Sequence, residues 1–245
     1  NTFSASFEQC DTNENGTANF DFSSVENQLL SQFPHLDKPN VQIRYFLSQT
    51  DAENQSNAIA DPQNFNNTTN YNQSLFIRVD SQGCFYIGEH INLVVNPLPL
   101  NNATVDDIEV CDDDTDGFYN DFRLDNQRND ILNGENPSLY NIEFYDNPAD
   151  RIANSNALGN TYTNTTRDGN TIYVRIIDNT TGCINDNLQF QVKVNPLPAI
   201  AQNISDLVIC DIDSDLTYAF NFMAPTDQAF MDDQILNGLD PNLYT

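Results

Sequence analysis

Positive charge is what this chain has least of: 9 Lys and Arg stand against 36 Asp and Glu among 245 residues, a formal charge of −27. Clustered Lys and Arg are needed to bind phosphate groups, so this balance excludes nucleic acid and anionic lipid as partners. No apolar run reaches the roughly 18 residues that a membrane-spanning helix requires. We therefore expect no direct membrane insertion of this segment.

Catalytic and zinc-binding patterns are also missing from the sequence. There is no G-x-S-x-G, no H-E-x-x-H and no glycine-rich phosphate loop. The only histidines are His35 and His90, and the cysteines are isolated, which disfavours zinc. We predict that the chain is not an enzyme. Paired carboxylates for glycoside hydrolysis remain an open alternative, because none of the 36 acids is singled out by its context.

An internal repeat of about 100 residues organises what is present. The segment VNPLP occurs at 95–99 and again at 194–198, and ILNG occurs at 131–134 and 235–238. A Cys-Asp pair recurs three times in the same register, and several independent blocks keep the same order. We predict a tandem array of three units: repeat 1 at 1–99, repeat 2 at 100–198, and the N-terminal part of an incomplete repeat 3 at 199–245.

The pattern within each repeat is that of short strands. Segments 41–48, 74–80 and 171–178 alternate apolar and polar residues, as half-buried strands do. One short helix per repeat is expected, beginning in repeat 1 at a capping box formed by Ser23 and Glu26, and ending in repeat 2 near Asn133-Gly134. The predicted fold is all-β, with tandem immunoglobulin-like β-sandwich domains.

Two further equivalences concern polar residues. Arg78 and Arg175 occupy matching strand positions, and we predict structural ion pairs with carboxylates there, with ligand binding as the alternative. The sequence contains N-glycosylation sequons, among them those at 66–68 and 164–166. A chain this rich in Asn produces sequons by chance, so we do not expect glycosylation at any one of them.

Five cysteines fall on equivalent positions of the repeats. One precedes the acidic loop of each unit, and the other stands in a Gly-Cys step before the last strand. We predict the disulfides Cys10–Cys84 and Cys111–Cys183, with Cys210 unpaired and its partner beyond the last residue. Disulfides indicate an oxidising, extracellular compartment. Buried free thiols are the alternative.

The acidic loops have alternating oxygen side chains followed, in the first two repeats, by glycine. This spacing matches the front half of a calcium loop, in which alternate residues converge on one hard cation. Position 12 of that loop lacks the usual Glu, so further oxygens must come from neighbours such as Glu8 and Glu109, from Asp21 and Asp121, from a backbone carbonyl such as that of Phe118, or from water. A solvated acidic turn is the alternative. We predict structural Ca²⁺ sites at Asp11, Asn13, Asn15, Asp112, Asp114, Asp116, Asp211, Asp213 and Asp215.

The order of these blocks resembles the repeats of very large surface proteins of gliding Bacteroidota. The residues that carry the resemblance are CDDDTDGF from 111, ILNG from 131, YTNTT from 162, IYVR from 172, and the final GC and VNPLP. Those proteins are gliding-motility adhesins exported by the type IX secretion system. The resemblance implies a surface filament or stalk that contacts surfaces or polysaccharides. Two loops depart from the acidic pattern of the second: the first has Asn13 and Asn15 at ligand positions, and the third has Leu216 in place of glycine.

We therefore predict a structural segment of a large extracellular adhesin or filament, stiffened by disulfides and calcium. Its expected partners are neighbouring repeats of the same chain, and surface polysaccharide or other filament chains are further candidates. The first rival is a non-catalytic carbohydrate-binding or spacer module of a secreted multidomain enzyme. An exposed row of aromatic side chains on one sheet face would favour that rival.

Overall fold

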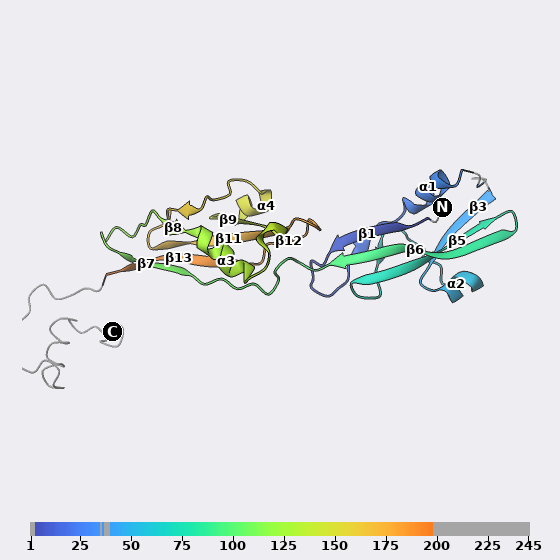
Figure 1. Cartoon of the computed structure of the whole chain (residues 1–245), viewed down its shortest axis with the longest axis horizontal. Coiled ribbons are helices and arrows are strands. Elements are labelled where there is room, and N and C mark those ends of the chain that lie inside the picture. The colour runs from blue at the N-terminus through green and yellow to red at the C-terminus, as the bar shows by residue number, and fades with distance from the viewer. Residues whose placement is uncertain (1–2, 35, 37–39, 198–245) are drawn as a thin grey trace, which may run out of the picture. The chain divides into compact units, whose positions relative to one another are not determined.

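The computed structural model describes residues 3–34, 36 and 40–197, which cover most of the first two repeats (Figure 1). Repeat 1 contains a four-stranded sheet in the order β1-β6-β5-β3, and a small pair of strands, β2 and β4. Strand β1 runs parallel to β6, whereas β6–β5 and β5–β3 are antiparallel. The strands are β1 (Ala5–Cys10), β2 (Asn19–Phe20), β3 (Val41–Phe46), β4 (Phe65–Asn66), β5 (Asn72–Ser81) and β6 (Cys84–Asn96).

Repeat 2 has the same strand order. Strand β7 runs parallel to β13, β13 neighbours β11, and β9 pairs with β11 antiparallel, while β8 and β10 form the small pair. The last long strand of repeat 1 is here divided into β12 and β13. The strands are β7 (Ile108–Asp112), β8 (Phe122–Arg123), β9 (Tyr140–Tyr145), β10 (Thr161–Tyr162), β11 (Gly169–Asp178), β12 (Ile184–Asn185) and β13 (Gln189–Pro196).

The core of repeat 1 follows from the period of two in its strands. Leu75, Ile77 and Val79 alternate along β5 and are all buried, in the same core cluster as Leu93 of β6. Phe20 and Val25, which are fully buried, cover the sheet from the small strand pair and from a helix. The alternating segments of the sequence are thus strands with one face in the core. The predicted fold class, tandem all-β domains of immunoglobulin-like sandwich type, is confirmed.

Among the residues that the structure describes, each repeat contains two short α-helices, so the prediction of one is wrong. The two expected from the sequence are α1 (Val25–Gln32) and α3 (Leu124–Leu132), and α3 ends as predicted at Asn133 and Gly134, both with positive φ. The two missed are α2 (Gln49–Asn54) and α4 (Pro148–Ala153), each six residues long. A single turn of 3₁₀ helix, η2 (Pro137–Leu139), precedes β9.

Helix capping also differs from the prediction. Ser23 donates its hydroxyl, and its backbone N–H, to the carboxylate of Asp21, and Ser24 makes no side-chain cap, so the capping box at α1 is wrong. The cap forms at α2 instead, where the Ser48 hydroxyl accepts the N–H of Asp51 at 3.1 Å. These missed helices are too short to carry an apolar periodicity, and only their caps could have indicated them. No helix within the described residues is long and apolar enough to cross a membrane.

The predicted structural ion pairs of the two strand arginines are confirmed. Arg78 is buried and donates to both oxygens of Asp80, and also to the carbonyl of Ala52 at 2.9 Å. Its counterpart Arg175 pairs with Asp186 at 3.1 Å. In each repeat the guanidinium therefore joins the central strand to neighbouring segments.

Acid should weaken the Asp80 ion pair. Hydrogen bonds from Arg78 hold the pKa of Asp80 below its ordinary value. Desolvation raises this pKa, and a hydrogen bond from Arg44 lowers it further. A carboxyl whose pKa is lower in the folded than in the unfolded state stabilises the fold at pH values above its unfolded-state pKa of about 3.9. This stabilisation is lost as the pH falls through the pKa of the folded state. We expect Asp80→Asn to cost about 2 kcal/mol of unfolding free energy at pH 7, because charged hydrogen bonds are lost.

The measurement is thermal unfolding of both proteins between pH 7 and pH 2. The two should become similar in stability at the acid end, where Asp80 of the unmodified protein is protonated. Asp61→Asn is the control, because Asp61 is exposed and only accepts the N–H of Gln63, which Asn can also accept. A constant stability difference at every pH would contradict the role of the charge.

Candidate metal site and disulfide

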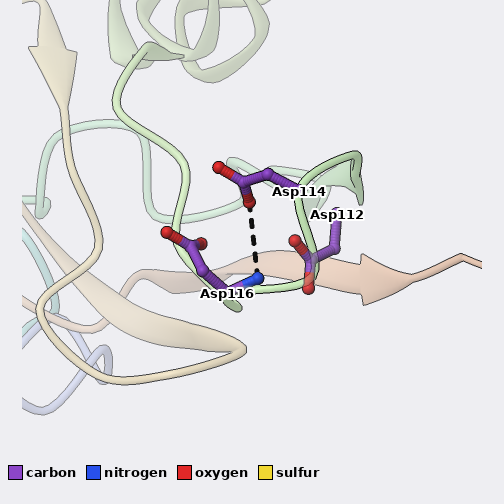
Figure 2. Close-up of side chains that lie close together, drawn as sticks. All are labelled: Asp112, Asp114 and Asp116. Carbon is purple, nitrogen blue, oxygen red and sulfur yellow. Dashed lines mark hydrogen bonds between the residues drawn. The ribbon is translucent and has the colours of Figure 1, made fainter.

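The acidic loop of repeat 2 brings the three predicted carboxylates together. Asp112 ends β7, and the chain then turns through Thr115 and Gly117, both of which have positive φ. One oxygen of each of Asp112, Asp114 and Asp116 lies within 4.8 Å of the others. Figure 2 shows the three side chains gathered at this loop. Such a group of hard oxygens is able to hold a divalent cation.

Backbone amides hold these side chains in place. The N–H of Gly117 donates to Oδ2 of Asp112 at 3.0 Å, and the N–H of Phe118 donates to Oδ1 of Asp116 at 2.7 Å. The N–H of Asp116 donates to Oδ1 of Asp114 at 3.3 Å. Asp112 is only 4% exposed, and its second oxygen, Oδ1, is buried without a hydrogen-bond partner.

Mutual repulsion in this loop affects the protonation of Asp114. The hydrogen bond from the Asp116 amide lowers the pKa of Asp114, but desolvation together with the negative charges of Asp116 and Asp113 outweighs it. The net result is a pKa above the ordinary value of an aspartate. The carboxylate cluster is therefore strained electrostatically in the absence of a positive charge.

The equivalent loop of repeat 1 is satisfied by its own backbone. Buried Asp11 accepts the N–H of Asn15 at 3.0 Å through one oxygen and that of Gly16 at 2.8 Å through the other. The side-chain oxygen of Asn15 accepts both the N–H and the hydroxyl of Thr17. Asn13 is exposed, and within the described residues its side chain makes no hydrogen bond with these groups. The predicted loop of repeat 3, with Asp211, Asp213 and Asp215, lies outside the described residues.

Several neighbours considered as additional ligands are engaged elsewhere. Glu8 accepts from Asn96, and Glu109 pairs with Lys193 at 3.3 Å and accepts from Asn195. The carboxylate of Asp21 accepts the N–H and the hydroxyl of Ser23. These three carboxylates are thus occupied by contacts of their own.

A buried asparagine that sequence reasoning missed fixes each acidic loop. Asn164 is 2% exposed; its oxygen accepts the N–H of Tyr119 at 2.7 Å, and its amide donates to the carbonyls of Gly117 and Thr166 at 2.9 and 2.8 Å. Asn67 makes the same set of bonds in repeat 1, with Ala18, Gly16 and Thr69. The signal in the sequence was the Asn-Thr-Thr block common to both repeats.

Asn164 is also the residue that would carry the glycan of the sequon at 164–166. Every polar group on the side chain of Asn164 is hydrogen-bonded and buried, so the residue cannot carry a glycan in the folded domain. The recurrence of Asn-Thr-Thr therefore reflects structure.

The disulfide of the described chain joins the two repeats. Cys10, at the end of β1, is bonded to Cys183, in the Gly-Cys step of repeat 2. Both predicted intra-repeat disulfides, Cys10–Cys84 and Cys111–Cys183, are therefore wrong. Cys84 and Cys111 are free and exposed.

Strand geometry explains why the cysteines of one repeat do not bond to each other. Cys10 is in register with Asn96, at the end of β6, whereas Cys84 begins the same strand. Strand β6 has 13 residues, and at about 3.3 Å per residue its ends are roughly 40 Å apart. A disulfide requires Cα atoms within about 7 Å. Cys111 is likewise in register with Asn195, far along the chain from Cys183.

Residues 6–99 and 107–198 each match the family described as the Flavobacterium inter-domain disulphide bond domain. Together they make up most of the chain. The chain belongs to this family. The description of the family agrees with the bond between Cys10 and Cys183, which joins one inter-domain disulphide bond domain to the next. No curated protein matches the chain.

The two free thiols occupy different positions of the repeat, one in the acidic loop and one in the Gly-Cys step. Cys111 is the loop cysteine of the second inter-domain disulphide bond domain and corresponds to Cys10 of the first. Cys84 is the Gly-Cys cysteine of the first domain and corresponds to Cys183 of the second. The observed bond joins one cysteine of each type.

Proposed function

We propose that this chain is a segment of an array of inter-domain disulphide bond domains, in which the loop cysteine of each domain bonds the Gly-Cys cysteine of the next. The observation that carries the proposal is the Cys10–Cys183 bond between successive domains. The exposed thiols of Cys84 and Cys111 occupy the two positions from which the same bond would continue toward further domains.

The array serves as a structural part of an extracellular surface protein, an adhesin or filament used in adhesion and gliding motility. Three features support this role. Stable disulfides belong to oxidising compartments outside the cytoplasm. Stacked repeats that contact only their neighbours suit extended structures that transmit force. The blocks from CDDDTDGF to VNPLP resemble the repeats of gliding-motility adhesins exported by type IX secretion.

The rival role, a carbohydrate-binding or spacer module of a secreted enzyme, has less support. Phe85 and Tyr86 are the most exposed aromatic residues described, at 59% and 57%. They are consecutive in β6, so they face opposite sides of the sheet and do not form a row on one face. Phe85 also lies under the guanidinium of Arg78, 4.0 Å from it, and Tyr86 stacks on His90.

A complementation experiment tests the array. All proteins would carry Cys210→Ser, so that only Cys84 and Cys111 provide free thiols. Under mild oxidation at high concentration, the protein with both cysteines is expected to form a ladder of head-to-tail oligomers on non-reducing gels. The variants Cys84→Ser and Cys111→Ser should each stay monomeric, and their mixture should give a dimer linked through Cys84 and Cys111.

The controls distinguish specific from random oxidation. If either single variant forms homodimers as readily as the mixture forms heterodimers, the complementary pairing is refuted. Peptide mapping without reduction should recover Cys10 linked to Cys183 throughout. Immunogold labelling of intact cells tests the location, and label that appears only after permeabilisation would refute a surface role.

A further inference from the structure

We infer that the acidic loop of repeat 2 is a specific site for a divalent cation of the calcium class, and that the matching loop of repeat 1 is not. This goes beyond the proposed array and does not depend on it. The first observation is the group of Asp112, Asp114 and Asp116, whose carboxylate oxygens lie within 4.8 Å of one another.

The second observation is the orphaned oxygen of Asp112. This carboxylate is 4% exposed, and Oδ2 accepts one amide while Oδ1 is buried and has no partner. In Figure 2 the carboxylate faces the side chains of Asp114 and Asp116. A buried anionic oxygen without a partner is costly, and a cation held between the three carboxylates would satisfy it.

The loop of repeat 1 provides an internal comparison. There the corresponding carboxylate, Asp11, has both oxygens occupied by the amides of Asn15 and Gly16. The second and third ligand positions are asparagines, so the set carries one negative charge in place of three. The same backbone turn is thus closed by amides in repeat 1 and leaves an oxygen open in repeat 2.

The donor set selects the kind of cation. All three side chains offer hard carboxylate oxygens, and two of them are exposed, which allows water to complete the coordination. Calcium accepts such flexible sets of six to eight oxygens, whereas zinc and other soft metals prefer imidazole or thiolate. For an exposed extracellular loop of this type the dissociation constant is of order 10⁻⁴ to 10⁻³ M.

The test is a titration of the ¹⁵N-labelled full chain with CaCl₂, followed by NMR. Calcium is added to about 10 mM, which is enough to saturate a site with a dissociation constant of order 10⁻⁴ to 10⁻³ M. The amide signals of Asp116, Gly117 and Phe118 are expected to shift and saturate, while those of Asn15 and Gly16 stay in place. Equal shifts in both loops, or no saturable shift in repeat 2, would overturn the inference. Residue-specific signals keep the third loop from confusing the result.

Two substitutions in the same loop provide matched variants. Asp114→Asn removes one predicted ligand charge, and Asp113→Asn removes the same charge one residue away, from a side chain outside the cluster. We expect Asp114→Asn to weaken calcium binding at least about tenfold and Asp113→Asn to change it less than about threefold, since a missing ligand removes a direct contact and a neighbouring charge only a screened one. Equal weakening by the two would show diffuse attraction to an acidic surface and would overturn the site.

Discussion

Reduction of the Cys10–Cys183 disulfide is expected to lengthen the chain greatly when it is pulled from its two ends. The bond closes a loop with a sequence separation of 173 residues. While it is intact, force passes across the sulfur atoms, and the residues between the two cysteines cannot extend. After reduction they can, and about 3.5 Å per residue gives roughly 600 Å of additional contour length.

Single-molecule force spectroscopy with handles at both termini measures this length directly. Cys10→Ser should show the long extension with or without reductant, whereas Cys84→Ser, the matched control, should need reductant as the unmodified protein does. The control removes a cysteine that is free in the described chain. If the full extension appeared in the oxidised, unmodified protein, the conclusion that the disulfide carries the force would be wrong.

The loop also matters for the proposed array. If Cys111 forms the same bond with a following domain, the two disulfide loops overlap in sequence, because Cys111 lies between Cys10 and Cys183. Most of each domain would then lie outside the path of force. An array of this kind would resist extension even when individual domains unfold, as a surface filament under load requires.

Asn164→Ala is expected to destabilise repeat 2 by about 3 kcal/mol, because it removes the three hydrogen bonds that join this buried side chain to its partners. Those partners are the N–H of Tyr119 and the carbonyls of Gly117 and Thr166. For a domain of this size the unfolding temperature should fall by about 10 °C or more. Differential scanning calorimetry of the oxidised full chain would measure the change.

Matched variants separate the bracing role from a general effect of substitution. Asn67→Ala removes the same three bonds in repeat 1 and should have a similar effect there. Asn187→Ala is the control, since Asn187 is exposed and its side chain makes no hydrogen bond to any residue that the structure describes. Its effect should stay within about 0.5 kcal/mol. Asn164→Asp should destabilise at pH 7 at least as much as Asn164→Ala, because a buried carboxylate would face the carbonyls of Gly117 and Thr166 with no proton to donate. A loss of less than about 1 kcal/mol of unfolding free energy in Asn164→Ala would contradict this structural role of Asn164.

Much of this protein follows from the sequence alone. The repeat, the strands and the fold class are local or periodic properties, because alternation along segments such as 74–80 directly reports which face is buried. The ion pairs of Arg78 and Arg175 were also predictable, since a charged residue in a buried strand needs a carboxylate partner. The spacing of Asp112, Asp114 and Asp116 likewise indicated that their side chains would converge.

The tertiary structure decided the features that depend on where strands end. Spacing assigned each cysteine its position in the repeat, but pairing depended on β1 running parallel to β6, which puts Cys10 and Cys84 at opposite ends of one sheet. The bond therefore had to reach another domain, and it reaches Cys183. Tertiary contacts also distinguished the two acidic loops, because amides of the turn satisfy both oxygens of Asp11 and only one of Asp112.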